Sequence, residues 1–225
     1  MMTFYSAVGV YRIEEEDGRK VPYIQKLGKY HPISIPEFAI WSILLWEVMT
    51  YDELRTAYLR QFPEKSGDAP SFDELLEILV KRKLIVKGVG YTGLDALFGM
   101  LSNAFVVPFR IGMAKKFCTV LKLVISGKLG INALWTWREK LDRAENHVMK
   151  LILQTPLSAP EILRCFERGV EDVSSPDKVI SAIYVSEDSD QEHIANEERL
   201  NPQVQEVLGA IANLYLKRRV ILELP

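Results

Sequence analysis

The sequence contains few residues of the kinds that cross-link small domains or organise metal ions. Its two cysteines, Cys118 and Cys165, lie far apart, which argues against a disulfide scaffold and suits a reducing cytoplasm. Its three histidines, His31, His147 and His193, form no His-x-x-x-His pair, and no Cys-x-x-Cys pair occurs. We therefore expect no metal site.

Long apolar runs and a strong net charge are also absent. The longest uncharged run, Ala96 to Phe109, includes Ser102, Asn103 and Pro108 and is shorter than the ~18–20 residues that a membrane-spanning helix needs. The first residues lack the basic start and apolar core of a signal peptide. The formal net charge of −2 gives no overall attraction to DNA or to an anionic membrane. These features predict a cytoplasmic protein with no membrane partner.

Recognisable catalytic motifs are missing too. No serine or cysteine lies in a nucleophile motif, and the acidic run Glu14 to Glu16 falls in a predicted hairpin loop. Gly88 to Gly93 spells G-x-G-x-x-G, but a dinucleotide site also needs an acid about twenty residues later. Ala96 to Arg138 contains no acid. We therefore expect no cofactor and no catalytic residues, and we assign these glycines to a turn.

Helix starts are the clearest positive signal in the chain. A Ser/Thr-x-x-Glu capping box lets the hydroxyl bond the N3 amide while the glutamate bonds the cap amide. Four such boxes precede apolar-periodic runs: Ser34/Glu37, Thr50/Glu53, Ser71/Glu74 and Ser158/Glu161. Before them, Tyr5 to Ile13 and Val21 to Ile24 read as a hairpin that turns at Asp17-Gly18.

The predicted elements fall into two similar groups. In the first half, we expect helices over 35–48, 51–62 and 72–83, then a strand at 84–86 and a turn at 88–90. In the second half, we expect helices over 143–154, 159–168 and 202–216, the last capped by Asn201. The segments Leu79 to Val86 and Leu214 to Leu222 both run from a helix through basic residues into a strand. Three helices followed by a strand pair is the winged helix-turn-helix arrangement.

The stretch between these groups differs from the rest of the chain in its charge composition. Ala96 to Arg138 has six cations and no acid, so the remainder of the chain carries −2 − 6 = −8. Apolar residues then recur at spacings of three and four, which predicts one helix over 132–154. These residues are Leu134, Trp137, Leu141, Ala144, Val148 and Leu151. They form either a homodimer seam, which we favour, or part of the chain's own core.

Candidate DNA contacts lie at the end of the second group. Asn and Gln pair with adenine edges, and Lys and Arg hold phosphates. The last predicted helix offers Gln203, Gln205, Asn213, Lys217, Arg218 and Arg219, and the basic linker adds Lys115, Lys116 and Lys122. The corresponding helix of the first group begins with acids, among them Asp73 and Glu77, which suit phosphate poorly.

At the level of element order, the chain resembles tandem winged helix-turn-helix proteins, a class dominated by bacterial transcription regulators. Residues 4–88 are also similar to PqqD-like peptide-recognition domains. That likeness rests on a strand pair followed by Phe38-Ala-Ile-Trp41, Thr50-x-x-Glu-Leu54 and Phe72-x-x-x-Leu-x-x-Leu79. It implies binding of a peptide as an added strand.

The sequence therefore predicts a mostly α, α+β protein with small β-hairpins. Its expected parts are residues 1–93 (hairpin and first winged-helix unit), 94–138 (basic helical linker) and 139–225 (second unit). The favoured function is a non-catalytic, DNA-binding regulator, and the alternative is a peptide- or protein-recognition module. A continuous positive face would favour DNA, whereas an open sheet edge beside a hydrophobic groove would favour peptide.

Overall fold

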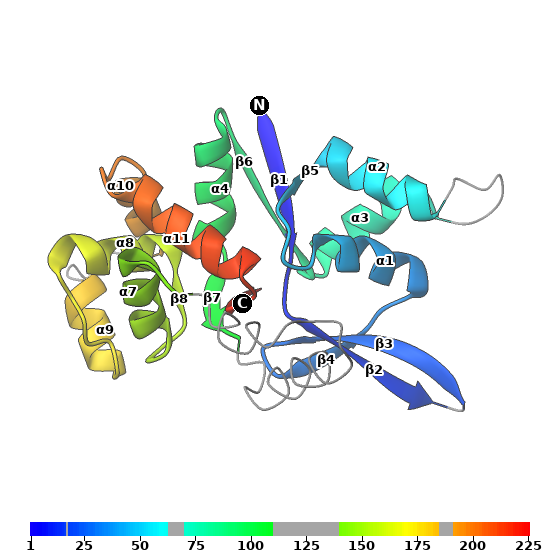
Figure 1. The fold of residues 1–225 in the computed structure, drawn as a ribbon, viewed down its shortest axis with the longest axis horizontal. Coiled ribbons are helices and arrows are strands. Elements are labelled where there is room, and N and C mark those ends of the chain that lie inside the picture. The colour runs from blue at the N-terminus through cyan, green and yellow to red at the C-terminus, as the bar shows by residue number, and fades with distance from the viewer. Residues whose placement is uncertain (17, 63–69, 110–139, 185–190) are drawn as a thin grey trace, which may run out of the picture.

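The computed structural model describes residues 1–16, 18–62, 70–109, 140–184 and 191–225. The chain is a mixed α+β protein with small antiparallel sheets, as expected (Figure 1). Its first unit comprises β1 (Met2–Ala7), β2 (Val10–Glu16), β3 (Arg19–Lys26), β4 (Lys29–Pro32), α1 (Ile35–Leu44), β5 (Met49–Thr50), α2 (Tyr51–Gln61), α3 (Phe72–Lys81) and β6 (Ile85–Gly90).

The second unit begins earlier in the chain than predicted. It comprises α4 (Gly93–Ser102), β7 (Phe105–Pro108), α7 (Arg143–Ile152), β8 (Leu157–Ser158), α8 (Ala159–Arg168), α9 (Pro176–Ile183), α10 (Gln191–Glu198), α11 (Val204–Leu216) and β9 (Val220–Glu223). Residues 94–109, which we placed in the linker, instead form α4 and β7. Both pack into the second hydrophobic core through residues such as Phe98 and Val106, because their apolar side chains need a buried surface.

The main sheets of the two units have the same strand order. The first runs β5–β1–β6 and the second β8–β7–β9, and all pairs are antiparallel. β1 precedes α1–α3 and β7 precedes α7–α11, a two-residue strand directly precedes α2 and α8, and the third strand follows the last helix of each unit. The two main sheets therefore share one topology, although α4, which precedes β7, has no counterpart before β1.

The ends of α3 and α11 repeat the same backbone geometry. Lys83 and Arg218 both have φ +56°, and the next residue donates its amide back to the helix. Leu84 N bonds the Leu79 carbonyl at 2.9 Å, and Arg219 N bonds the Leu214 carbonyl at 2.8 Å. These six-to-one bonds are Schellman closures. They turn each helix directly into its strand.

The N-terminal hairpin differs from the prediction. The expected strand over 5–13 breaks at Gly9, which has φ +77° and where a Cβ would lie 2.3 Å from the Gln25 carbonyl oxygen. The two halves therefore join different sheets. β1 enters the main sheet, and β2 starts a separate meander in the order β2–β3–β4.

The helix starts agree closely with the capping signals. All four predicted boxes are formed, at Ser34, Thr50, Ser71 and Ser158. The last helix begins at Val204, two residues later than predicted. The reason is local: the Asn201 side chain accepts the Gln203 amide at 2.9 Å, which makes a turn before the helix rather than its cap.

The helix expected over 132–154 is shorter in the structure. Asp142 caps α7 in an extended conformation, with ψ −178°, and its carboxylate accepts the Glu145 amide. A helix cannot pass through an extended residue, so α7 starts at Arg143. The positions before 140 lie outside the described residues.

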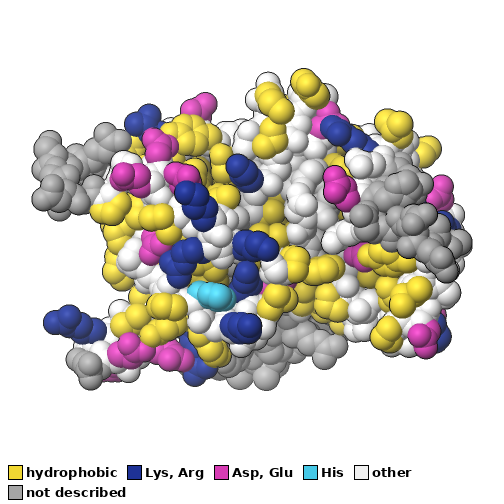
Figure 2. All heavy atoms as spheres, turned by 180° about the vertical axis from the view of Figure 1, so that it is seen from behind, with side chains coloured by type: hydrophobic (Ala, Val, Ile, Leu, Met, Phe, Trp, Pro, Cys, Tyr) yellow, Lys and Arg dark blue, Asp and Glu magenta, His cyan; other side chains and the backbone are white. Residues whose placement is uncertain are grey.

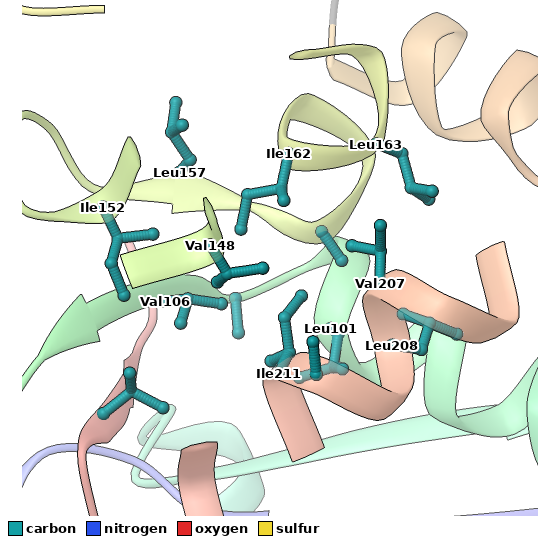
Figure 3. Packing of buried hydrophobic residues seen from close by; sticks show 14 of the residues in the cluster. Leu101, Val106, Val148, Ile152, Leu157, Ile162, Leu163, Val207, Leu208 and Ile211 are labelled. Atoms are coloured by element: carbon teal, nitrogen blue, oxygen red, sulfur yellow. The ribbon is translucent and has the colours of Figure 1, made fainter. Parts of the chain in front are cut away.

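Two hydrophobic clusters lie on opposite faces of the β1–β6 ladder. Ala7 and Ile85 belong to the cluster under α1, α2 and α3, whereas their neighbours Val8 and Val86 belong to the second cluster. This alternation is the two-residue period of a strand. Figure 1 shows the ladder between α4 on one side and α1–α3 on the other. Figure 3 shows side chains of α4, α7, α8 and α11 meeting over β7 in the second cluster.

A buried tyrosine connects the two units. The Tyr215 hydroxyl on α11 accepts the Ser6 hydroxyl at 2.9 Å and the Trp46 amide at 3.0 Å. Gly9 also donates its amide to the Leu222 carbonyl at 2.8 Å. Burial raises the pKa of Tyr215 to about 12, so it remains a neutral hydroxyl. The third helix of the second unit is therefore anchored against the first unit.

Candidate nucleic-acid interface

The cations predicted at the end of α11 are largely committed to contacts within the chain. Lys217 Nζ lies 2.7 Å from the fully buried Glu145 carboxylate. The Arg218 guanidinium lies 5.0 Å from the centre of the Trp46 ring, which itself packs on Phe109. Lys217 and Arg218 therefore support α7 and the junction between the units.

The other predicted α11 contacts are spread along the helix and differ in exposure. Gln205 and Asn213 are exposed, whereas Gln203 is half-buried at the start of the helix and Arg219 is half-buried at the start of β9. The face of α11 that carries Val207 and five further residues is buried in the core. Lys115, Lys116 and Lys122 lie outside the described residues.

The predicted dimer seam is occupied within the chain. Val148 and Leu151 are fully buried in the second core, and Leu141 packs against it. α7 packs on β7 and α11, and its apolar stripe is buried against them. Of the two alternatives for these residues, a homodimer seam or the chain's own core, the described ones belong to the core. Leu134 and Trp137 lie outside the described residues.

The glycine motif has a packing explanation. The expected turn at 88–90 is wrong, because β6 continues through Gly90 and pairs with β1. A Cβ on Gly88 would lie 2.1 Å from the Ala96 carbonyl oxygen, and one on Gly90 would lie 2.4 Å from the Ala96 amide nitrogen. These glycines let the backbones of β6 and α4 approach each other closely.

A different set of cations gathers where β3, β4 and the end of α3 meet. We call this set the basic face, and it consists of Lys26, Lys29, His31, Arg82 and Lys83. Figure 2 shows Lys and Arg side chains collected around a histidine on this side of the molecule. Lys29 and Lys83 are exposed, whereas Lys26, His31 and Arg82 are half-buried.

Local backbone geometry brings these residues together. Leu27 and Gly28 both have positive φ, 47° and 75°, and they form the tight turn that pairs Lys26 with Lys29. Arg82 Nη1 lies 3.0 Å from Glu37 Oε1, and its other terminal nitrogen donates to the Pro32 carbonyl. Arg82 thereby fixes the end of α3 against β4.

The cations of the basic face act on one another electrostatically. The pKa of His31 is lowered by burial and then by the charges of Lys26, Arg82 and Lys29. Burial also lowers the pKa of Lys26, and Lys83 lowers it further. The charge of Glu223 acts on the Lys26 pKa in the opposite direction, and burial raises the pKa of the Glu223 carboxyl itself. The concentration of positive charge around His31 and Lys26 favours a bound anion.

The sequence pattern shows only part of this face. The basic run Lys81-Arg82-Lys83 matches the end of the last helix of the second unit in composition. Lys26, Lys29 and His31, however, belong to a strand and turn whose pairing partner could not be assigned from the sequence. Only the tertiary contact between α3 and β4 places the two groups side by side.

Cys165 is fully buried, and burial raises its pKa to about 12, so its thiolate is strongly disfavoured at neutral pH. Within the described ranges, no three His, Cys, Asp or Glu side chains are grouped to hold a metal ion. None of the helices in the described part has the length and apolar character needed to cross a bilayer. The chain matches no protein-family model, no curated protein and no solved structure.

Proposed function

We propose that this protein is a non-catalytic regulator that binds double-stranded DNA through its phosphate backbone, using the basic face. The observation that carries the proposal is the gathering of four cations, Lys26, Lys29, Arg82 and Lys83, where β3, β4 and the end of α3 meet, so that like charges repel one another there. Phosphate groups would relieve that repulsion, and release of the counterions condensed on the duplex would drive binding.

The same surface supports backbone contact rather than base recognition. The first turns of α3, which would enter the groove in a winged-helix complex, carry exposed Asp73, Glu74 and Glu77. α11 is anchored by Tyr215 and its flanking cations. The basic face instead lies at the opposite, C-terminal end of α3, beside a β-turn. We therefore propose contact with phosphates along the duplex, with little dependence on its sequence.

The experiment is a binding titration of the full chain with duplexes of unrelated sequence at low ionic strength. The double variant Lys29→Glu/Lys83→Glu should weaken binding at least about tenfold, equivalent to roughly 1.4 kcal/mol. Lys150→Glu, an exposed site on α7, should leave affinity unchanged. Equal losses for both variants would show that the basic face is not the interface.

The peptide-recognition alternative has one specific observation in its favour. Among the described residues, β2 pairs only with β3, so its outer edge is open. Tyr11 and Ile13 on that strand are 48% and 51% exposed, and Tyr11 packs edge-on against Phe38 of α1. An extended peptide could add to this edge. This alternative would be favoured if the protein does not bind duplex DNA but captures apolar peptides. Ile13→Arg should then abolish that capture.

A further inference from the structure

A groove between α4 and α10 lies outside the basic face. Its volume is about 420 Å³, within the range of about 300–1,000 Å³ typical of small-molecule sites. Two polar contacts cross it. Arg199, directly after α10, pairs with Asp95 of α4 at 3.1 Å, and Gln191 of α10 donates to the Ser102 carbonyl at 3.4 Å.

The charges that line the groove favour a cation. Asp95 on one wall and Glu192 on the other supply two carboxylates, against one guanidinium from Arg199. Hydrogen bonds from Arg199 and Thr92 lower the pKa of Asp95, so its carboxylate stays ionised. The Ser102 carbonyl belongs to the last turn of α4, where the helix dipole is negative.

Three apolar side chains, Phe98, Ala195 and Val89, belong to the otherwise polar lining of the groove, which favours an organic cation over a metal ion. Phe98 is 5% exposed, Ala195 packs against the second core, and Val89 of β6 is 42% exposed. Metal ions of the Mg²⁺ and Ca²⁺ type prefer sites surrounded by oxygen ligands. A primary amine with a hydrophobic body would place its ammonium among the carboxylates and its body over these side chains.

Gly99 indicates that space in this groove is retained. It lies in the middle of α4, where glycine costs about 1 kcal/mol relative to alanine. A Cβ there would meet only Val89, at 3.4 Å from its carbonyl oxygen and 3.8 Å from its nitrogen. Unlike Gly88 and Gly90, Gly99 is therefore not required by close backbone packing. Because Gly99 lines the groove, a large side chain at this position would reduce the groove volume.

We infer that the α4–α10 groove binds a small organic amine with an apolar body. None of the residues of the basic face lines this groove, so the inference does not depend on DNA binding. The ammonium is recognised by the carboxylates of Asp95 and Glu192 and by the Ser102 carbonyl, and the apolar body contacts the apolar side chains of the lining.

The test uses isothermal titration calorimetry of the full chain with tryptamine and with its neutral counterpart tryptophol. Tryptamine should bind at least about tenfold more tightly. Glu192→Gln should weaken tryptamine binding by a similar factor, Gly99→Leu should abolish it, and the distant surface change Glu15→Gln should have no effect. Absence of tryptamine binding, or equal affinity for tryptophol, would overturn the inference.

The variants also control for binding elsewhere and for misfolding. If tryptamine binds a folded Gly99→Leu protein as well as it binds the original, the groove is not the site. If Gly99→Leu fails to fold by circular dichroism, Ala195→Leu occupies the same groove from the α10 wall and should abolish binding. Retention of tryptamine affinity in a folded Ala195→Leu protein would equally contradict the groove assignment.

Discussion

Gly88 illustrates how one sequence motif can arise from different physical needs. In a nucleotide-binding loop, glycine allows the backbone to approach a phosphate. Here the approaching group is the protein's own helix, because the Ala96 carbonyl would lie 2.1 Å from a Cβ on Gly88. The glycine indicates that another group approaches the backbone closely at this position, but the sequence alone does not indicate whether that group is a ligand phosphate or the protein's own helix.

Substitution of this glycine should be costly. Gly88→Ala forces α4 away from β6 and should lower the free energy of unfolding by about 3 kcal/mol, as overpacking does. Gly209→Ala, in the middle of α11 with no atom within 4 Å of the added Cβ, should raise it by about 0.5–1 kcal/mol. Chemical denaturation of both variants measures the difference. A neutral Gly88→Ala would contradict the close packing of β6 and α4.

Glu223 should make stability depend on pH in an unusual direction. Burial raises its pKa above the usual carboxyl value, while its carboxylate accepts the Leu27 amide at 3.0 Å. A raised folded pKa gives stability that is present below the unfolded pKa and is lost as pH rises through the folded pKa. Glu223→Gln should therefore be more stable than the original protein at neutral pH, and the difference should vanish in acid.

Glu53→Gln is the matched control for that measurement. Hydrogen bonds from Thr50 lower the pKa of Glu53, so its stabilising effect is present above the unfolded pKa and is lost as pH falls through the folded pKa. This variant should be less stable than the original at neutral pH. Unfolding free energies measured across the acid range should thus show opposite trends. Parallel trends would refute the assignment for Glu223.

Among the features of the helices and strands, the sequence predicted those that depend on contacts between neighbouring residues. A capping box involves atoms only three residues apart, so Ser34, Thr50, Ser71 and Ser158 identified four helix starts correctly. Thr92 and Asp142 cap α4 and α7 in the same way, with Asp95 and Glu145 as their partners. Extending the Ser/Thr-x-x-Glu pattern to aspartate at either position would have found both.

Strand pairs and ion pairs between residues far apart in the sequence could not be predicted in this way. The pairing of β1 with β6 joins Met2 to Gly90, and no local rule indicates that partnership. The same limit applies to the candidate site. Lys217 looked available for phosphate because its partner, Glu145, lies on another helix. The basic face was missed because it requires α3 to meet β4.

The Lys217–Glu145 pair therefore predicts a stability effect rather than a binding effect. Lys217→Met leaves the buried Glu145 carboxylate without its cation and should lower the free energy of unfolding by about 3 kcal/mol. The exposed control Lys150→Met should change it by no more than about 0.5 kcal/mol. Denaturant titration measures both. If Lys217→Met instead leaves stability unchanged and weakens duplex binding, α11 is part of the DNA interface.

In the whole molecule, the repeated sheet topology is joined into one body by buried polar contacts. Tyr215 reaches Ser6 and Trp46, and the amide of Gly9 bonds the carbonyl of Leu222. This junction holds the second unit's last helix against the first unit. Beside this junction lies the basic face, where Leu27 donates its amide to Glu223 and Lys83 Nζ donates to the Pro225 oxygen at 2.8 Å. The proposal of duplex binding rests on that surface.

The most direct test of DNA binding is its salt dependence. Fluorescence anisotropy of a labelled duplex, repeated over a range of salt concentrations, gives the slope of log affinity against log salt. Lys29→Ala/Lys83→Ala should make that slope less negative by about 0.9 for each lysine that contacts a phosphate, whereas Lys150→Ala should leave it unchanged. Duplex binding that is absent at low salt, or whose slope is the same in all three proteins, would contradict the basic face as the DNA interface.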